Sequence, residues 1–185
     1  MRTWMVLPAL VLLSFGVLRA GAQALTADEQ SFIDKHISEI VKTKVTRLTD
    51  AAVTKVFSTP FYKLQVIIDD GDGGTETSDR IVARNATQLL NVSAPGTDTD
   101  VPQMLKMLDP KFKLAADADA TVLQQALDVL YPPMGSDDKK AVKFTHAGNQ
   151  WTFIRGTFFE SKKGYVFTTG ADGTITGVKF MLKLP

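Results

Sequence analysis

Residues 141–185 constrain the fold of this chain most strongly, because aromatic and β-branched residues recur there in short runs separated by turn signals. The runs cover residues 141–146, 151–159, 164–169 and 174–184. Between them stand Gly148-Asn149, Lys163-Gly164 and Asp172-Gly173, and dipeptides of this kind connect antiparallel strands. The pattern predicts a four-stranded antiparallel meander.

The facing of these strands follows from the length of the turns. Turns of even length place one apolar set on a shared face, which we expect to be the core face: Ile154, Phe158, Tyr165, Phe167, Val178, Phe180 and Leu182. The opposite face then carries Thr157, Phe159, Val166 and Thr168 together with an aromatic and cationic set: Trp151, Phe153, Arg155, Lys179 and Lys183. A glycine inside a strand often marks a bulge, so Gly156 could reverse the facing of the residues before it.

The aromatic and cationic set is the candidate partner-binding surface. Aromatic residues and arginine dominate the hot spots of protein interfaces, so we expect these side chains to bind an unknown protein or a small polar ligand. The competing interpretation is that a helix from the other half of the chain packs on this face while the lysines extend to its rim.

The N-terminus has the three parts of a secretory signal peptide. Arg2 precedes an apolar run over residues 4–18, and small residues at Ala22 and Ala24 offer cleavage sites. The run is about 15 residues, shorter than the roughly 20 needed to span a bilayer. We therefore expect residues 1–24 to be cleaved, with no stable membrane anchor afterwards and a secreted or periplasmic mature protein.

Composition narrows the functional classes further. Removing residues 1–24 takes away Arg2 and Arg19 and no acidic residue, so the formal charge changes from +1 to −1. No basic field for nucleic acid remains. The chain has no cysteine, which rules out disulfides, a thiol nucleophile and a cysteine zinc site. The length suits one domain, or two small lobes that share a core.

The N-terminal half predicts a helix followed by antiparallel strands. Thr26 and Glu29 form a capping-box pattern, and apolar residues at helical spacing predict a helix over residues 27–49. Beyond it, β-rich runs predict strands over 53–57 and 61–68, then over 80–83 and 88–92. Residues 69–74 predict a turn, and residues 93–100 a linker.

The C-terminal half begins with two predicted helices. The first covers residues 101–108, and the second is capped by Asp117 or Asp119 and ends before Pro132. The order helices, strands, helices, strands predicts an α+β fold in which a helix followed by an antiparallel meander is repeated twice with helices packed on the sheets. We expect residues 25–100 and 101–185 to form these two units.

A resemblance accompanies this pattern in the second half. A helix ending at Tyr131-Pro132, a Gly148-Asn149 turn before an aromatic strand and an Asp172-Gly173 hairpin resemble PepSY-like and β-lactamase-inhibitor-protein-like exported domains, over about residues 119–184. The long segment 133–140 departs from their compact pattern. The resemblance implies binding or inhibition and supplies no catalytic residue.

The motifs of enzyme chemistry are weak in this sequence. His36 and His146 are the only histidines, lie far apart, and suit surface or boundary positions. Ser136 and Lys139 match Ser-x-x-Lys, but in a polar loop rather than at the start of a buried helix. Residues 69–74 lack the ligand alternation of a calcium loop. We expect no catalytic residue, metal site or cofactor.

Two functional hypotheses follow. The first is an exported, non-enzymatic binding or inhibitor-type domain. The second is a small-ligand carrier or enzyme of the NTF2-like type, with a pocket enclosed by the curved sheet. A structural envelope protein is a third, weaker possibility. The location of any pocket separates the first two.

Overall fold

The structure of the chain is a computed structural model that describes residues 22–36, 42–69, 75–92, 100–131, 144–158 and 161–181. Most of the predicted signal peptide, the Ser-x-x-Lys match at Ser136 and Lys139, and Lys183 lie outside these residues. Two antiparallel sheets and four helices make up the described part. Its α+β class confirms the prediction, and each half of the chain contains helices and an antiparallel sheet.

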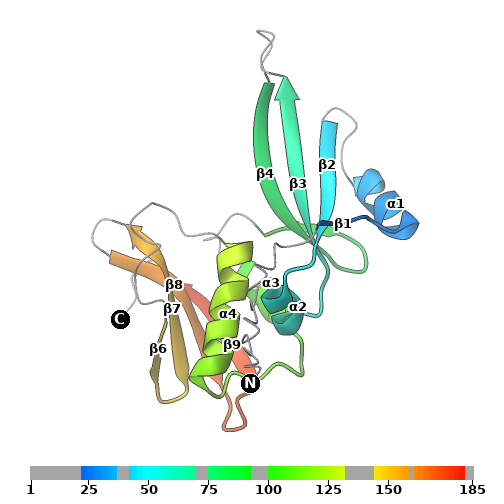
Figure 1. Cartoon of the computed structure of the whole chain (residues 1–185). Coiled ribbons are helices and arrows are strands. Elements are labelled where there is room, and N and C mark those ends of the chain that lie inside the picture. The colour runs from blue at the N-terminus through cyan, green and yellow to red at the C-terminus, as the bar shows by residue number, and fades with distance from the viewer. Residues whose placement is uncertain are drawn as a thin grey trace, which may run out of the picture.

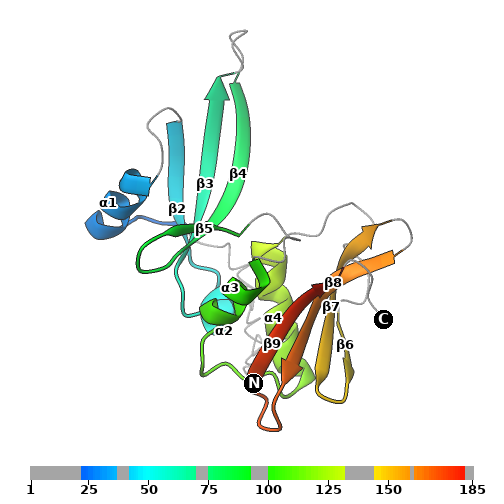
Figure 2. The same ribbon diagram turned by 180° about the vertical axis from the view of Figure 1, so that it is seen from behind.

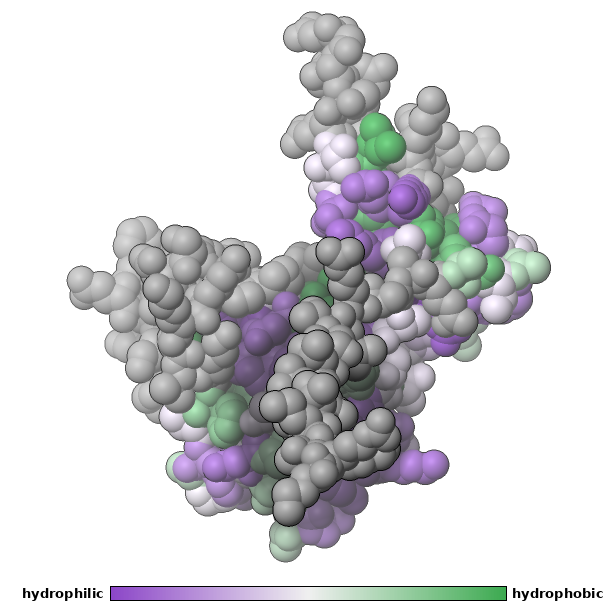
Figure 3. Space-filling view, viewed as in Figure 1, coloured by the Kyte–Doolittle hydropathy of each residue, from purple (hydrophilic) through white to green (hydrophobic). Residues whose placement is uncertain are grey.

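The first sheet projects from the body of the molecule, with helix α1 (Ala27–His36) on one of its faces (Figure 1). Its strands are antiparallel neighbours in chain order: β1 (Ala22–Gln23), β2 (Lys42–Leu48), β3 (Phe61–Asp69), β4 (Thr75–Arg84) and β5 (Leu89–Asn91). Hydrophilic residues gather over the projecting strands (Figure 3). One exposed ion pair there joins Lys63 and Asp79 at 2.6 Å.

The second sheet is the predicted meander. Its strands also follow chain order: β6 (Phe144–Ala147), β7 (Gln150–Phe158), β8 (Ser161–Thr169) and β9 (Ile175–Met181). Helix α4 (Asp117–Leu130) crosses one face of this sheet, and helix α3 (Asp100–Met107) lies beside β9 (Figures 1 and 2). The predicted positions of both helices are confirmed.

One hydrophobic core joins the two halves. It contains Val53 and Val56 of helix α2 (Ala51–Val56), Phe61 of β3, and residues from α3, α4 and the second sheet. Helices α2 and α4 pack against each other between the sheets. A smaller core lies on the other face of the first sheet, where Ile33 of α1 packs with Tyr62, Leu64, Val66 and Val82. The two lobes therefore share most of their buried surface.

Two segments of the N-terminal half differ from the predictions. The helix predicted over 27–49 ends at His36, and residues 42–48 form β2 instead. Thr43, Val45 and Thr46 are β-branched and gain a full ladder with β3, which an isolated helix could not offer. The strand predicted over 53–57 is helix α2, because Oδ1 of Asp50 accepts from the backbone N–H groups of Ala52 and Val53.

The capping box at the start of α1 is confirmed and extends into the sheet. Glu29 N–H donates to Thr26 Oγ1 at 3.2 Å, and Thr26 N–H donates to Glu29 Oε2 at 2.9 Å. The buried Glu29 carboxylate also accepts from Tyr62 Oη at 2.8 Å and pairs with Arg47 at 3.1 Å. Helix α1 is thus fastened to β2 and β3 through one carboxylate.

This contact changes the acidity of both partners. Burial raises the pKa of Glu29, but the hydrogen bonds from Thr26 and Tyr62 and the charge of Arg47 outweigh it, so the pKa lies below its ordinary value. Burial and the hydrogen bond to the Glu29 carboxylate raise the pKa of Tyr62.

The predicted facing of β7 is wrong before Gly156, and a bulge is the reason. The register between β7 and β8 shifts between Ile154 and Gly156, which leaves Arg155 as an extra residue. Trp151 therefore lies opposite Phe167, and Phe153 opposite Tyr165, on the core face. Gly156 had indicated this possibility.

Candidate functional site

The predicted partner-binding residues do not form a common surface. Trp151 and Phe153 are 2% and 0% exposed, and Arg155 is 5% exposed under α4. Lys179 lies opposite Val166 on the outer face, where it is exposed, and Lys183 lies outside the described residues. The burial of three members corrects the expectation of an exposed aromatic and cationic face. Its physical cause is the bulge, which turns these side chains inward. The helix that covers them is α4, from their own half of the chain.

Arg155 has a structural partner set at the end of α4. Its Nη1 lies 2.5 Å from Oδ1 of Asp128, and its Nη2 donates to the carbonyl oxygens of Leu127, at 3.0 Å, and Tyr131. A guanidinium at this end satisfies carbonyls that the helix leaves open and complements the negative end of the helix dipole. These contacts assign Arg155 to packing of β7 on α4.

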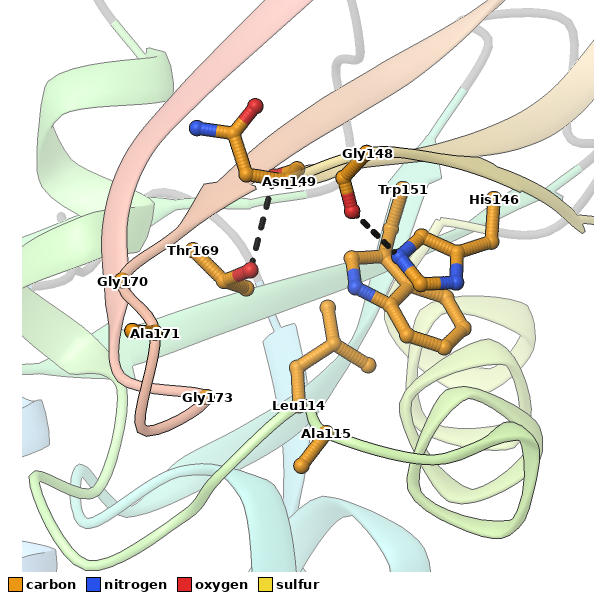
Figure 4. Close-up of a pocket in the computed structure, with 10 residues that line it drawn as sticks. All are labelled: Leu114, Ala115, His146, Gly148, Asn149, Trp151, Thr169, Gly170, Ala171 and Gly173. Atoms are coloured by element: carbon orange, nitrogen blue, oxygen red, sulfur yellow. Dashed lines mark hydrogen bonds between the residues drawn. The ribbon is translucent and has the colours of Figure 1, made fainter.

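Trp151 also lines a pocket at one end of the second sheet (Figure 4). The pocket has a volume of about 540 Å³, within the range of small-molecule sites. One wall is the β6–β7 turn with His146, Gly148 and Asn149. The other walls are Leu114 and Ala115 from the segment between α3 and α4, and Thr169, Gly170, Ala171 and Gly173 from the β8–β9 turn.

Two glycines allow the turns that shape this pocket. Gly148 has φ of 60° in the β6–β7 turn, and Gly173 has φ of 77° in the β8–β9 turn. The second turn approaches the α3–α4 segment closely, since a Cβ on Gly173 would lie 2.8 Å from Cβ of Ala115. The N–H of Leu114 donates to the carbonyl oxygen of Gly173 at 2.8 Å. The backbone therefore holds two of the pocket walls together.

A side-chain cluster beside the pocket supports the same contact. Lys113 Nζ lies 2.9 Å from Asp172 Oδ2 and also bonds to Thr174 Oγ1. Asp172 further accepts from the hydroxyl and the backbone N–H of Thr174, at 2.6 and 3.0 Å. The hydrogen bonds from Thr174 and Lys113 hold the pKa of Asp172 well below its usual range.

His146 covers the indole of Trp151. The two rings are stacked with centroids 3.8 Å apart and planes 8° from parallel. His146 Nε2 lies 2.8 Å from the carbonyl oxygen of Gly148, and because a carbonyl only accepts, Nε2 carries the hydrogen. His146 is exposed at the end of β6, as the sequence predicted. It forms an outer wall that holds the indole in place.

The indole N–H of Trp151 is an unpaired donor. In Figure 4 its nitrogen faces the side of the pocket where Thr169 and Leu114 lie. No described residue accepts a hydrogen bond from it, although Trp151 is only 2% exposed. Thr169, nearby, uses its hydroxyl hydrogen toward the carbonyl oxygen of Asn149 at 3.4 Å, which leaves its oxygen lone pairs as acceptors. The pocket therefore offers a donor and an acceptor on an otherwise apolar lining.

The pocket holds little catalytic potential. Apart from His146, none of the residues that line it is ionisable. The other histidine, His36, is exposed on α1 and bonds to the carbonyl oxygens of Phe32 and Thr87, as expected of a surface residue. Within the described ranges, no group of three or more histidine, aspartate or glutamate side chains could hold a metal ion.

Sequence analysis identified Trp151 but missed Leu114, Asn149 and Thr169 as its neighbours in a pocket. A signal for part of the site was present. In an antiparallel meander the first and third turns lie at the same end of the sheet, so Gly148-Asn149 and Asp172-Gly173 were bound to meet there. The approach of Leu114 depends on packing between helices and sheet, which no local pattern encodes.

No family model matches this chain, and neither does any curated protein or solved structure. In the part of the chain that the structure describes, no helix is both long and apolar enough to cross a membrane.

Proposed function

We propose that this protein is an exported, non-enzymatic binding domain that holds its ligand or partner in the pocket between the β6–β7 and β8–β9 turns. The observation that carries the proposal is the unpaired indole N–H of Trp151 in a pocket of about 540 Å³. A buried donor without an acceptor costs free energy, and a ligand acceptor would recover it. The lack of an ionisable pair in the lining favours binding over catalysis.

Export rests on the signal-peptide pattern at residues 1–24, and the periplasm or the cell exterior is the proposed location. Sequencing the N-terminus of the protein from the exported fraction would test it, with cleavage after Ala22 or Ala24 as the expected result. Recovery of the intact N-terminus would count against export. The PepSY-like resemblance of the second half agrees with a binding role and adds no partner.

The NTF2-like alternative has less support. It needs a pocket enclosed by the curved sheet, whereas Phe153, Tyr165 and Phe167 fill the α4-facing side of the second sheet as part of the core. The pocket described above lies at the end of that sheet, beside its turns (Figure 4). A ligand there would contact turns rather than the sheet interior.

Retention of exported compounds tests the binding role. The protein is incubated with the exported fraction of its source cells, and retained molecules are identified by mass spectrometry. Thr169→Phe fills the pocket from its edge, and Thr168→Phe is the matched control on the other face of β8. We expect the wild type and Thr168→Phe to retain the same species and Thr169→Phe to lose it. Equal retention by both variants, or no specific species, would contradict the proposal.

A further inference from the structure

We propose that the pocket recognises an uncharged secondary amide carried with a small apolar group, as in an acetamido sugar or an N-acetylated peptide end. This inference rests on the proposed binding function and names the chemistry of its ligand. Three features of the lining carry it: the donor, the acceptor and the apolar wall.

The donor and acceptor are Trp151 Nε1 and Thr169 Oγ1. Trp151 Nε1–H has no acceptor among the described residues, and it faces the side where Thr169 lies (Figure 4). A secondary amide has one carbonyl acceptor and one N–H donor, which complement these two groups. A hydroxyl group could serve both in turn but would leave the neighbouring apolar wall without contact.

That apolar wall is formed by Leu114, with Ala115 beside it. Leu114 is 1% exposed, and in Figure 4 its side chain points toward Trp151. The methyl group of an acetamide would bury apolar area against it, which is favourable at about 25 cal/mol per Å². An amide with an attached methyl group therefore matches the wall and both polar groups together.

Charged ligands fit less well. Apart from His146, the residues that line the pocket carry no ionisable group, and Lys113 outside it is paired with Asp172 at 2.9 Å. A carboxylate or phosphate would thus lose its hydration without gaining a cation. The lining selects a neutral ligand.

Trp151 supplies a direct readout of binding. The chain has two tryptophans, Trp4 and Trp151, so Trp4→Phe in the full chain leaves one indole N–H signal in a nitrogen-15 NMR spectrum. The probes are N-acetylglucosamine, N-acetylalanine methylamide, glucose and acetate. Glucose lacks the acetamido group, and acetate keeps the methyl group but carries a charge.

We expect a saturable shift of the Trp151 indole signal with at least one amide probe, and none with glucose or acetate. Response to the sugar alone would point to a glycan source, and response to the methylamide alone to a peptide source. Thr169→Val removes the acceptor at nearly constant shape and should weaken amide binding about 5- to 10-fold, whereas Thr168→Val should leave it unchanged.

Three results would overturn the assignment: no shift with either amide, equal affinity for glucose or acetate, or unchanged affinity in Thr169→Val. These results are distinguishable from failure of the binding role itself. If the wild type retains an exported species that Thr169→Phe loses, while neither amide binds, the pocket remains a binding site and only its amide chemistry is wrong.

Discussion

Arg155 on β7 meets Asp128 on α4 across 2.5 Å, and this pair joins the bulged strand to the helix that covers it. Arg155 is 5% exposed and Asp128 31% exposed at the side chain, so the guanidinium is buried while the carboxylate keeps contact with water. The same guanidinium donates to carbonyl oxygens at the end of α4. A residue that sequence analysis placed on a binding surface therefore holds two core elements together.

Replacing Arg155 with methionine should lower the free energy of unfolding by about 2 to 3 kcal/mol, because the substitution leaves α4 carbonyls and Asp128 without their donor. The measurement is urea unfolding followed by circular dichroism. Lys179→Met, on the exposed outer face, is the control and should change stability by less than about 0.5 kcal/mol. Similar small effects at both positions would show that the buried guanidinium is not needed for packing.

Gly164 should be intolerant of even one methyl group. It lies opposite Ile154 beside the bulge, and a Cβ there would be 1.9 Å from the carbonyl oxygen of Phe153. Gly164→Ala must therefore shift the β7 backbone, and we expect a loss of about 3 kcal/mol. Gly177→Ala on β9 is the matched control, because its nearest neighbour would lie at 3.7 Å. It should be neutral or slightly stabilising, since glycine weakens a strand. Equal melting temperatures for the two variants would refute the close approach.

Glu29 should make stability depend on pH. Because its pKa is lower in the folded protein than the ordinary value of 4.5, its contribution is present above pH 4.5 and is lost as pH falls through the folded-state pKa. The stability difference between wild type and Glu29→Gln should therefore shrink between neutral and acidic pH. Denaturant titrations at neutral pH and below pH 4 measure it. A difference that stays constant with pH would show that the charge of Glu29 is not involved.

Tyr62 should act at the other end of the pH scale. Its folded-state pKa is raised above 10, so its contribution is complete below pH 10 and is lost as pH rises through the folded-state value. Tyr62→Phe should remove this component while keeping the ring in the smaller core. The phenolate absorbance near 295 nm, a general property of tyrosine, reports the titration directly. A Tyr62 titration at or below its ordinary pKa would contradict the contact with Glu29.

Helix α2 should depend on its cap. Asp50 Oδ1 accepts from the N–H groups of Ala52 and Val53 at 2.9 and 3.1 Å, so Asp50→Ala should cost about 1 kcal/mol. Asp50→Asn keeps an accepting oxygen and should cost much less. Thermal unfolding compares the two, and a neutral Asp50→Ala would mean that packing of α2 on α4 alone maintains the helix.

Local patterns predicted those parts of the protein whose structure depends on nearby residues. The capping box of Thr26 and Glu29, the ends of α4 and the four strands of the second sheet follow from hydrogen bonds or turns within a few residues. The α+β class follows from their order along the chain. Such features need only the backbone and its immediate neighbours, so the sequence alone was sufficient.

Tertiary structure decided the rest. Residues 42–48 became a strand because β3 provides a ladder for them, and Trp151 turned into the core because one extra residue at Arg155 shifts the register of β7. A one-residue shift moves every preceding side chain to the other face, and burial of aromatic area against α4 decides which register is stable. The pocket at Trp151 likewise exists only where Leu114 reaches the β8–β9 turn, a contact between segments far apart in sequence.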